Sequence, residues 1–123
     1  MANTIKINVE KELGIKKDFD VATSNINVEG ALKMQYNAAV ASDIEEKTGA
    51  EILEMNLKSL RDNSNYVKNT LKLTEKQSVL VDEMSTLDTA FLVNRICLRI
   101  MGNSDEEIEA IYADIDDGDL GNE

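Results

Sequence analysis

The side chains most able to do chemistry are the acidic residues of the last twenty positions. After Arg99 the chain has nine carboxylates and no basic residue, whereas the sequence up to Asn103 has fifteen acidic against thirteen basic residues. Nearly all of the formal net charge of −11 therefore lies in this tail. Clustered carboxylates can bind a cation or transfer protons. The acidic residues are Asp105, Glu106, Glu107, Glu109, Asp114, Asp116, Asp117, Asp119 and Glu123.

Within this tail, the segment DIDDGDL superficially resembles a calcium-binding loop. An EF-hand loop requires oxygen ligands at its positions 1, 3 and 5, a glycine at position 6 and a glutamate at position 12. With Gly118 at position 6, Ala113 and Ile115 occupy positions 1 and 3. With Gly121 at position 6, Gly118 and Leu120 occupy positions 3 and 5, and the sequence ends before position 12. The sequence therefore predicts no metal site.

No other pattern in the sequence predicts catalysis or a bound cofactor. The chain has no histidine, which is the commonest general base and transition-metal ligand. Its six glycines are isolated from one another, so neither common glycine-rich phosphate-binding loop occurs. Cys97, the single cysteine, lies in the apolar stretch RICLRIMG, which favours a small buried side chain over a reactive thiol. We therefore expect no enzyme, no catalytic residue and no cofactor.

Composition also narrows the classes of partner. An acidic chain without a cluster of lysines or arginines cannot gain binding energy by releasing counterions from nucleic acid, so neither nucleic acid nor an anionic membrane is an expected partner. The N-terminus lacks the apolar core of a signal peptide, and no apolar run approaches the roughly twenty residues that span a bilayer. We expect a cytoplasmic protein with one domain and a largely aliphatic core.

The N-terminal third has the pattern of short strands. Residues 4–9 alternate between apolar and polar side chains, and residues 19–23 form a second short candidate. Gly14 and its polar neighbours predict a turn between them, so a hairpin is expected. The asparagines, serine and glycine of residues 23–30 predict a connection that leads into helices.

From Ala31 onward the apolar spacing becomes helical. The first helix contains Leu32, Tyr36, Ala39, Val40 and Ile44, and the second runs from about Ile52 to a predicted end near Asp62 to Ser64. A shorter segment contains Tyr66, Val67 and Leu71. Two capping-box patterns, in which a hydroxyl and a carboxylate or amide three residues later satisfy free amides, predict further helix starts. They are Thr48 with Glu51 and Thr74 with Gln77.

The strongest helical pattern covers residues 87–101, with Ser85 or Thr86 as its cap and Gly102 as its C-terminal stop. Its polar stripe is narrow and consists of Asp88, Arg95 and Arg99, with Leu92 inside it. A helix that is apolar nearly all round is surrounded by protein. Either it is the central helix of a small bundle, or a partner or second subunit covers part of it.

Ser104 with Glu107 predicts a last short helix that fades into the acidic end. The simplest interpretation of such an end is a solvated, partly disordered terminus. Its apolar residues have nearly helical spacing, which favours the alternative of a segment that folds on a partner. We therefore predict a partner-binding or self-association surface made of Phe91, Leu92, Ile96, Ile100, Met101, Ile108, Ile111 and Tyr112.

Together these patterns predict a mainly α fold. It is a small bundle of four to six short helices with an N-terminal β-hairpin or short strands and an acidic, partly disordered C-terminal tail. Residues 1–103 are expected to form one domain, with strands and connection in 1–30 and helices in 31–103. Residues 104–123 are expected to form the short helix and the acidic tail.

The segment LKLTEKQSVLVDEMSTLDTAFLVNRICLRIMGNSDEEIEA (71–110) resembles the tail assembly chaperones of long-tailed phages and prophages of Gram-positive bacteria. The resemblance extends from about Ala31 onward and rests on the order of LKLTEKQ, FLVNRICLRIMG, SDEEI and an acidic end. It implies short N-terminal strands followed by helices. It also implies binding to the tape measure protein, which such chaperones keep soluble during tail assembly.

Further expectations follow from the same resemblance. The chain is expected to be a homo-oligomer in the cytoplasm of the infected or lysogenic bacterial host and to be absent from the mature virion. A longer form made by ribosomal frameshifting would recruit the tail tube protein, and this chain resembles the short form. Two alternatives stay open: a DNA-mimic inhibitor of a host nucleic-acid enzyme, and a minor structural subunit of the tail or connector.

Overall fold

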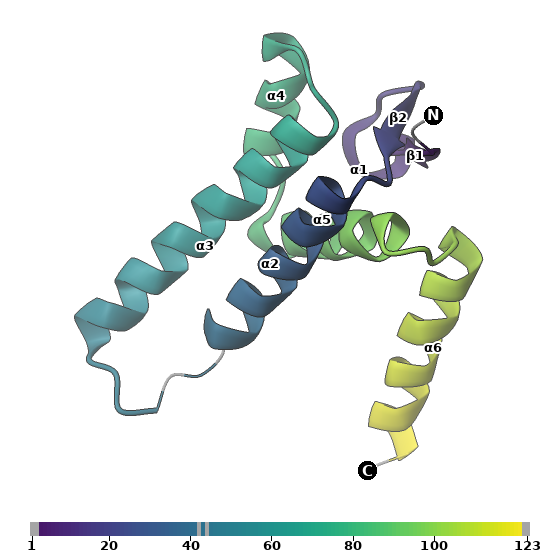
Figure 1. Cartoon of the computed structure of the whole chain (residues 1–123). Helices are drawn as coiled ribbons and strands as arrows, with labels where there is room; N and C mark the ends of the chain where they lie inside the picture. The colour runs from purple at the N-terminus through teal and green to yellow at the C-terminus, as the bar shows by residue number, and fades with distance from the viewer. Residues whose placement is uncertain (1–2, 42, 44, 122–123) are drawn as a thin grey trace.

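The computed structural model describes the backbone of residues 3–41, 43 and 45–121, and the side chains of these residues up to Ala113. It confirms the mainly helical fold with an N-terminal antiparallel hairpin (Figure 1). Among the described residues, no helix has the length and apolar character needed to cross a membrane. The elements in chain order are β1 (Thr4–Asn8), α1 (Glu10–Leu13), β2 (Asp18–Ala22), α2 (Asn25–Ala41), α3 (Gly49–Thr70), α4 (Glu75–Asp82), α5 (Thr86–Ile100) and α6 (Asp105–Gly121).

The predicted hairpin is present. Strand β1 pairs antiparallel with β2, and Ile7 lies opposite Phe19 with both side chains buried in the core. The connection contains a single helical turn, α1, that the sequence pattern does not predict, because four residues are too few to show a period. Gly14 ends this turn with a φ of +71°, a conformation that other residues adopt only with strain.

Helix α2 begins earlier than the sequence predicts. The expected connection over residues 23–30 is wrong, since the helix starts at Asn25, six residues before Ala31. Its first turns are held by the Asn27 side-chain amide, which donates to the Ala22 carbonyl at 2.7 Å. Asparagine and glycine are weak helix formers, but burial of Ala31 and packing of Val28 against the core outweigh that preference. Ile44 lies outside the described residues.

Helix α3 is one continuous element of 22 residues. The predicted end near residues 62–64 and the separate short segment after it are therefore wrong. Polar residues in that stretch weaken a helix without breaking it, and Val67 and Leu71 beyond it are buried in the core. Packing of this second half against α5 keeps the helix intact. The capping box of Thr48 with Glu51 begins the helix as predicted.

The other predicted helix ends are confirmed. Thr74 and Gln77 form the capping box of α4, and the Ser85 hydroxyl accepts from the Asp88 amide at the start of α5. Gly102 follows α5 with a φ of +109°. Ser104 and Glu107 exchange hydrogen bonds of 3.1 and 3.2 Å before α6. The backbone of α6 is helical as far as Gly121, which is longer than the short helix that the sequence predicts.

Helix α5 is the centre of the fold. It crosses the antiparallel pair α2 and α3 and also contacts β1 and α6 (Figure 1). The hairpin and helices α2 to α5 contribute to one hydrophobic core. The ends of α2 and α3 nearest their connecting loop extend past α5, and α6 extends away from the core at the opposite side (Figure 1). The core therefore lies around α5, and the loop-facing ends of α2 and α3, together with α6, project from it as helical arms.

Candidate interaction surface

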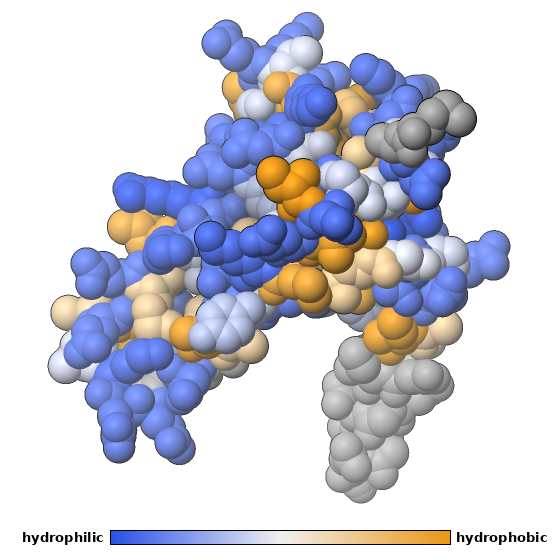
Figure 2. Space-filling model, in the orientation of Figure 1, coloured by the Kyte–Doolittle hydropathy of each residue, from blue (hydrophilic) through white to orange (hydrophobic). Residues whose placement is uncertain are grey.

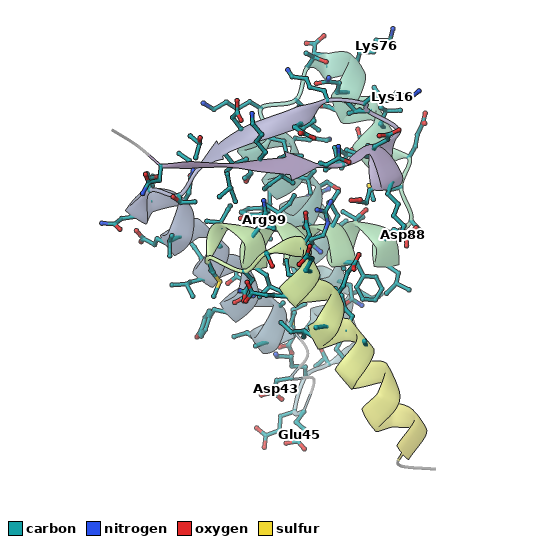
Figure 3. The ribbon with its side chains drawn as sticks, turned by 90° about the vertical axis from the view of Figure 1, so that its right-hand side faces the viewer. Lys16, Asp43, Glu45, Lys76, Asp88 and Arg99 are labelled. Carbon is teal, nitrogen blue, oxygen red and sulfur yellow. The ribbon has the colours of Figure 1, made fainter. Side chains whose placement is uncertain are left out.

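The two arginines of α5 hold three parts of the chain together. The Arg95 guanidinium donates to the Asn8 carbonyl at 2.6 Å and pairs with the carboxylates of Glu12 and Asp105. Arg99 donates to the Lys6 carbonyl at 2.7 Å. Figure 3 shows Arg99 on α5 beneath the hairpin. The arginines of the predicted polar stripe of α5 are therefore covered by the hairpin and the start of α6, whereas Asp88, at the other end of the stripe, is exposed.

Leu92, which the helical pattern places within that stripe, is almost fully buried. The long arginine side chains extend past it to reach polar partners at their tips. Asp105, the first acidic residue of the tail, forms an ion pair with Arg95, with its Oδ1 atom 3.2 Å from Nη1. The start of the acidic segment is thus part of the folded structure.

A groove of about 950 Å³ lies between α5 and α6 and reaches the α1 turn and the turn between α4 and α5. Its apolar lining includes the rings of Phe91 and Tyr112, which pack edge to face with their centroids 5.8 Å apart. The Asn94 side-chain amide donates to the Tyr112 hydroxyl at 2.8 Å and fixes that ring. The groove is consequently a shaped surface on which apolar side chains can pack.

The predicted interaction residues separate into two groups. Leu92, Ile96, Ile100 and Ile108 are at most 3% exposed. They form the interior of the chain and offer no surface in this conformation, because the hairpin, α2, α3 and α6 together enclose most of α5. The accessible ones are Phe91, Met101, Ile111 and, half-buried, Tyr112.

Of these, the groove brings together Phe91 and Tyr112 with Met84, a lining residue that the sequence pattern does not single out as an interaction residue. Met101 and Ile111 lie outside it. The spacing of Asp88 and Phe91 on α5, and of Met84 in the turn before it, gives no signal for a groove, because the opposite wall comes from α6.

The sequence pattern also did not predict that two apolar stripes, one on α2 and one on α3, are exposed. Their spacing of three or four residues predicts amphipathic helices with buried apolar faces. In the structure these faces are on the projecting arms, and the described part of α2 buries only Ala31 while α3 buries only Val67. Figure 2 shows hydrophobic atoms at the surface of this side of the molecule. The stripes are Leu32, Tyr36 and Val40 on α2 and Leu53, Leu57 and Leu60 on α3.

The thiol of Cys97 is fully buried beside Tyr66, which confirms the prediction of a structural cysteine. Burial raises the pKa of the Tyr66 hydroxyl far above its ordinary value, and the neighbouring Cys97 adds to that shift. Burial also raises the pKa of the Cys97 thiol. Both groups therefore stay neutral in the folded chain at a pH where they ionise in the unfolded chain.

This difference predicts loss of stability in alkaline solution. Because both folded-state pKa values are raised, the stability contribution is complete below the unfolded values of about 9 and 10 and declines as the pH rises through them. Urea denaturation between pH 8 and pH 11 should show a falling free energy of unfolding. The slope should be shallower in a Tyr66→Phe variant, which keeps the ring. An equal slope in that variant would contradict the assignment.

Comparison of the chain with protein-family models, with curated proteins and with solved structures gave no match. In the part of the chain that the structure describes, no group of three or more histidine, cysteine, aspartate or glutamate residues is arranged to hold a metal ion. The features that bear on function are therefore the groove and the two exposed stripes. They offer apolar surface on a small acidic protein.

Proposed function

We propose that this chain is an assembly chaperone that binds apolar helical segments of a client protein. Exposed apolar helix faces carry the proposal: the arms of α2 and α3 present six large apolar side chains, each at least 43% exposed. Contiguous apolar surface on a protein that is otherwise polar marks a contact with another protein. The sequence resemblance makes the tape measure protein of a long-tailed phage the proposed client.

The chemistry of the groove supports binding rather than catalysis. Of its charged lining residues, Arg95, Glu12 and Asp105 are already engaged with one another, and the Ser85 hydroxyl serves as the cap of α5. No lining residue is a thiol or an imidazole, so the groove lacks the common activated nucleophiles. The proposed role therefore requires only shape, apolar area and charge.

The acidic residues fit a chaperone better than a DNA mimic. A mimic needs carboxylates spread over one folded face in the manner of phosphates. Here several lysines lie exposed on the body, including Lys16 at the hairpin and Lys76 on α4 (Figure 3). Repulsion between anionic tails reaches about 8 Å at physiological salt, so it acts between neighbouring subunits and opposes aggregation of the assembly. We propose that the chain acts as a homo-oligomer.

Co-expression tests the proposal. A tape measure protein of a long-tailed phage should be recovered in the soluble fraction when it is co-expressed with the chain and should be insoluble without it. Pull-down through a tag on the client should retain the chain. Triple replacement of Leu53, Leu57 and Leu60 by serine should reduce recovery of the client several-fold. If the client stays insoluble and no complex can be isolated, the proposal fails.

A further inference from the structure

The groove between α5 and α6 combines an apolar floor with an acidic rim. Phe91 is half exposed at its edge, and Tyr112 and Met84 continue the apolar surface. Roughly two turns of a helix 10 Å wide occupy a volume of this size. The groove therefore has the dimensions and the floor for one face of an amphipathic helix.

The rim determines the sign of charge that the groove favours. Among the lining residues the acids outnumber the bases five to two, and Arg95 is shared between Glu12 and Asp105. Glu83, Asp88 and Glu109 make no ion pair in the described structure and are exposed. Asp88 lies near the N-terminal end of α5, whereas Arg99 lies near its C-terminal end (Figure 3). These three carboxylates surround the apolar floor from three different elements, so a cationic ligand meets negative potential from each.

We infer that the groove binds a basic amphipathic helix of a partner protein, with apolar residues at helical spacing on Phe91 and Tyr112 and lysines or arginines against Glu83, Asp88 and Glu109. This inference rests on the proposed function and deepens it, because it names the surface and the kind of client segment that it takes. Complementary charge favours this occupant over an acidic helix, since like charges across an interface are repelled.

Fluorescence anisotropy with the full chain tests the inference. The probe is a labelled 18-residue helical peptide with leucines at positions i, i+3, i+4 and i+7 and lysines along their flanks; its counterpart carries glutamates in place of the lysines. The basic peptide should bind at least about tenfold more tightly than the acidic one at low salt, and the difference should shrink as salt is added. No binding, or preference for the acidic peptide, would overturn the inference.

Matched variants locate the site. Glu83→Lys with Glu109→Lys should weaken binding of the basic peptide about tenfold, whereas Glu29→Lys with Glu54→Lys, which changes the net charge equally on α2 and α3, should weaken it less than threefold. Phe91→Ala should weaken both peptides' binding, and Val79→Ala, at an exposed apolar residue of α4 outside the groove, should not. Equal effects in the two charge pairs would overturn the assignment to the groove. Thermal unfolding by circular dichroism checks that each variant is folded.

Two further measurements separate this inference from the proposed function. If the charge-reversed variant solubilises the client as well as the unaltered chain does, the chaperone role stands and the groove inference falls. If the basic peptide binds in the groove but the client stays insoluble, the groove inference stands and the chaperone role falls. If light scattering shows a dimer that the groove variant abolishes, and the peptide does not bind, the occupant is a second copy and the inference is overturned.

Discussion

Replacing Ile96 by alanine is expected to lower the free energy of unfolding by about 3 kcal/mol. Ile96 has no exposed surface and lies at the centre of α5, where the hairpin and the helices share one core. Removing three buried carbons loses their transfer free energy and leaves a cavity that the neighbours fill only in part. A domain of this size has a total stability of about 5–15 kcal/mol, so the loss is large. Urea denaturation at pH 7 measures it.

Leu87→Ala is the control for this substitution. Leu87 is on the same helix and is 65% exposed, so its replacement should change the free energy of unfolding by no more than about 0.5 kcal/mol. A loss below about 1 kcal/mol for Ile96→Ala would show that α5 is not enclosed as described. The comparison also tests whether α5 is covered by its own chain or by a partner, because partner-dependent burial would make the loss depend on protein concentration.

Replacing Arg95 by methionine is expected to destabilise the fold by about 2 kcal/mol and to loosen α6. The substitution keeps an apolar stem but leaves the Asn8 carbonyl and the Glu12 carboxylate without their partner in a setting that is only about one-fifth exposed. Unpaired polar groups that are shielded from water account for this loss. It also removes the closer of the two arginine contacts of Asp105, which keeps only Arg99 Nε at 3.7 Å, so amide hydrogen exchange should rise over the first turns of α6 more than over α3.

Lys6→Met provides the matched control for Arg95. Its ion pair with Asp20 has the same kind of geometry, at 2.9 Å, but both side chains are more than 60% exposed. An exposed pair of this kind contributes little to stability and is screened by salt. Equal destabilisation by the two substitutions, or unchanged exchange in α6, would contradict the role given to Arg95. The Glu12→Gln and Arg95→Met double variant should be less destabilised than the sum of the single variants.

Local sequence patterns predicted the starts of α3, α4, α5 and α6. The caps at Thr48, Thr74, Ser85 and Ser104 were all predictable, because each uses a side chain and an amide only three residues apart. The alternation of β1 and the buried place of Cys97 were also visible in the sequence. The start of α2 and the continuity of α3 were not, since packing of Val28 and Val67 overrides weak local preferences.

Which apolar faces are buried depends on tertiary packing and could not be predicted from residue spacing. Leu92 lies in a polar stripe yet is enclosed, whereas Leu53 and Tyr36 lie on regular apolar faces yet are exposed. Arg95 binds the Asn8 carbonyl 87 residues away, a pairing that no spacing along one helix can indicate. Local hydrogen bonds depend on groups a few residues apart, so the sequence contains them; burial depends on which elements meet in space, and that meeting creates both the groove and the uncovered arms.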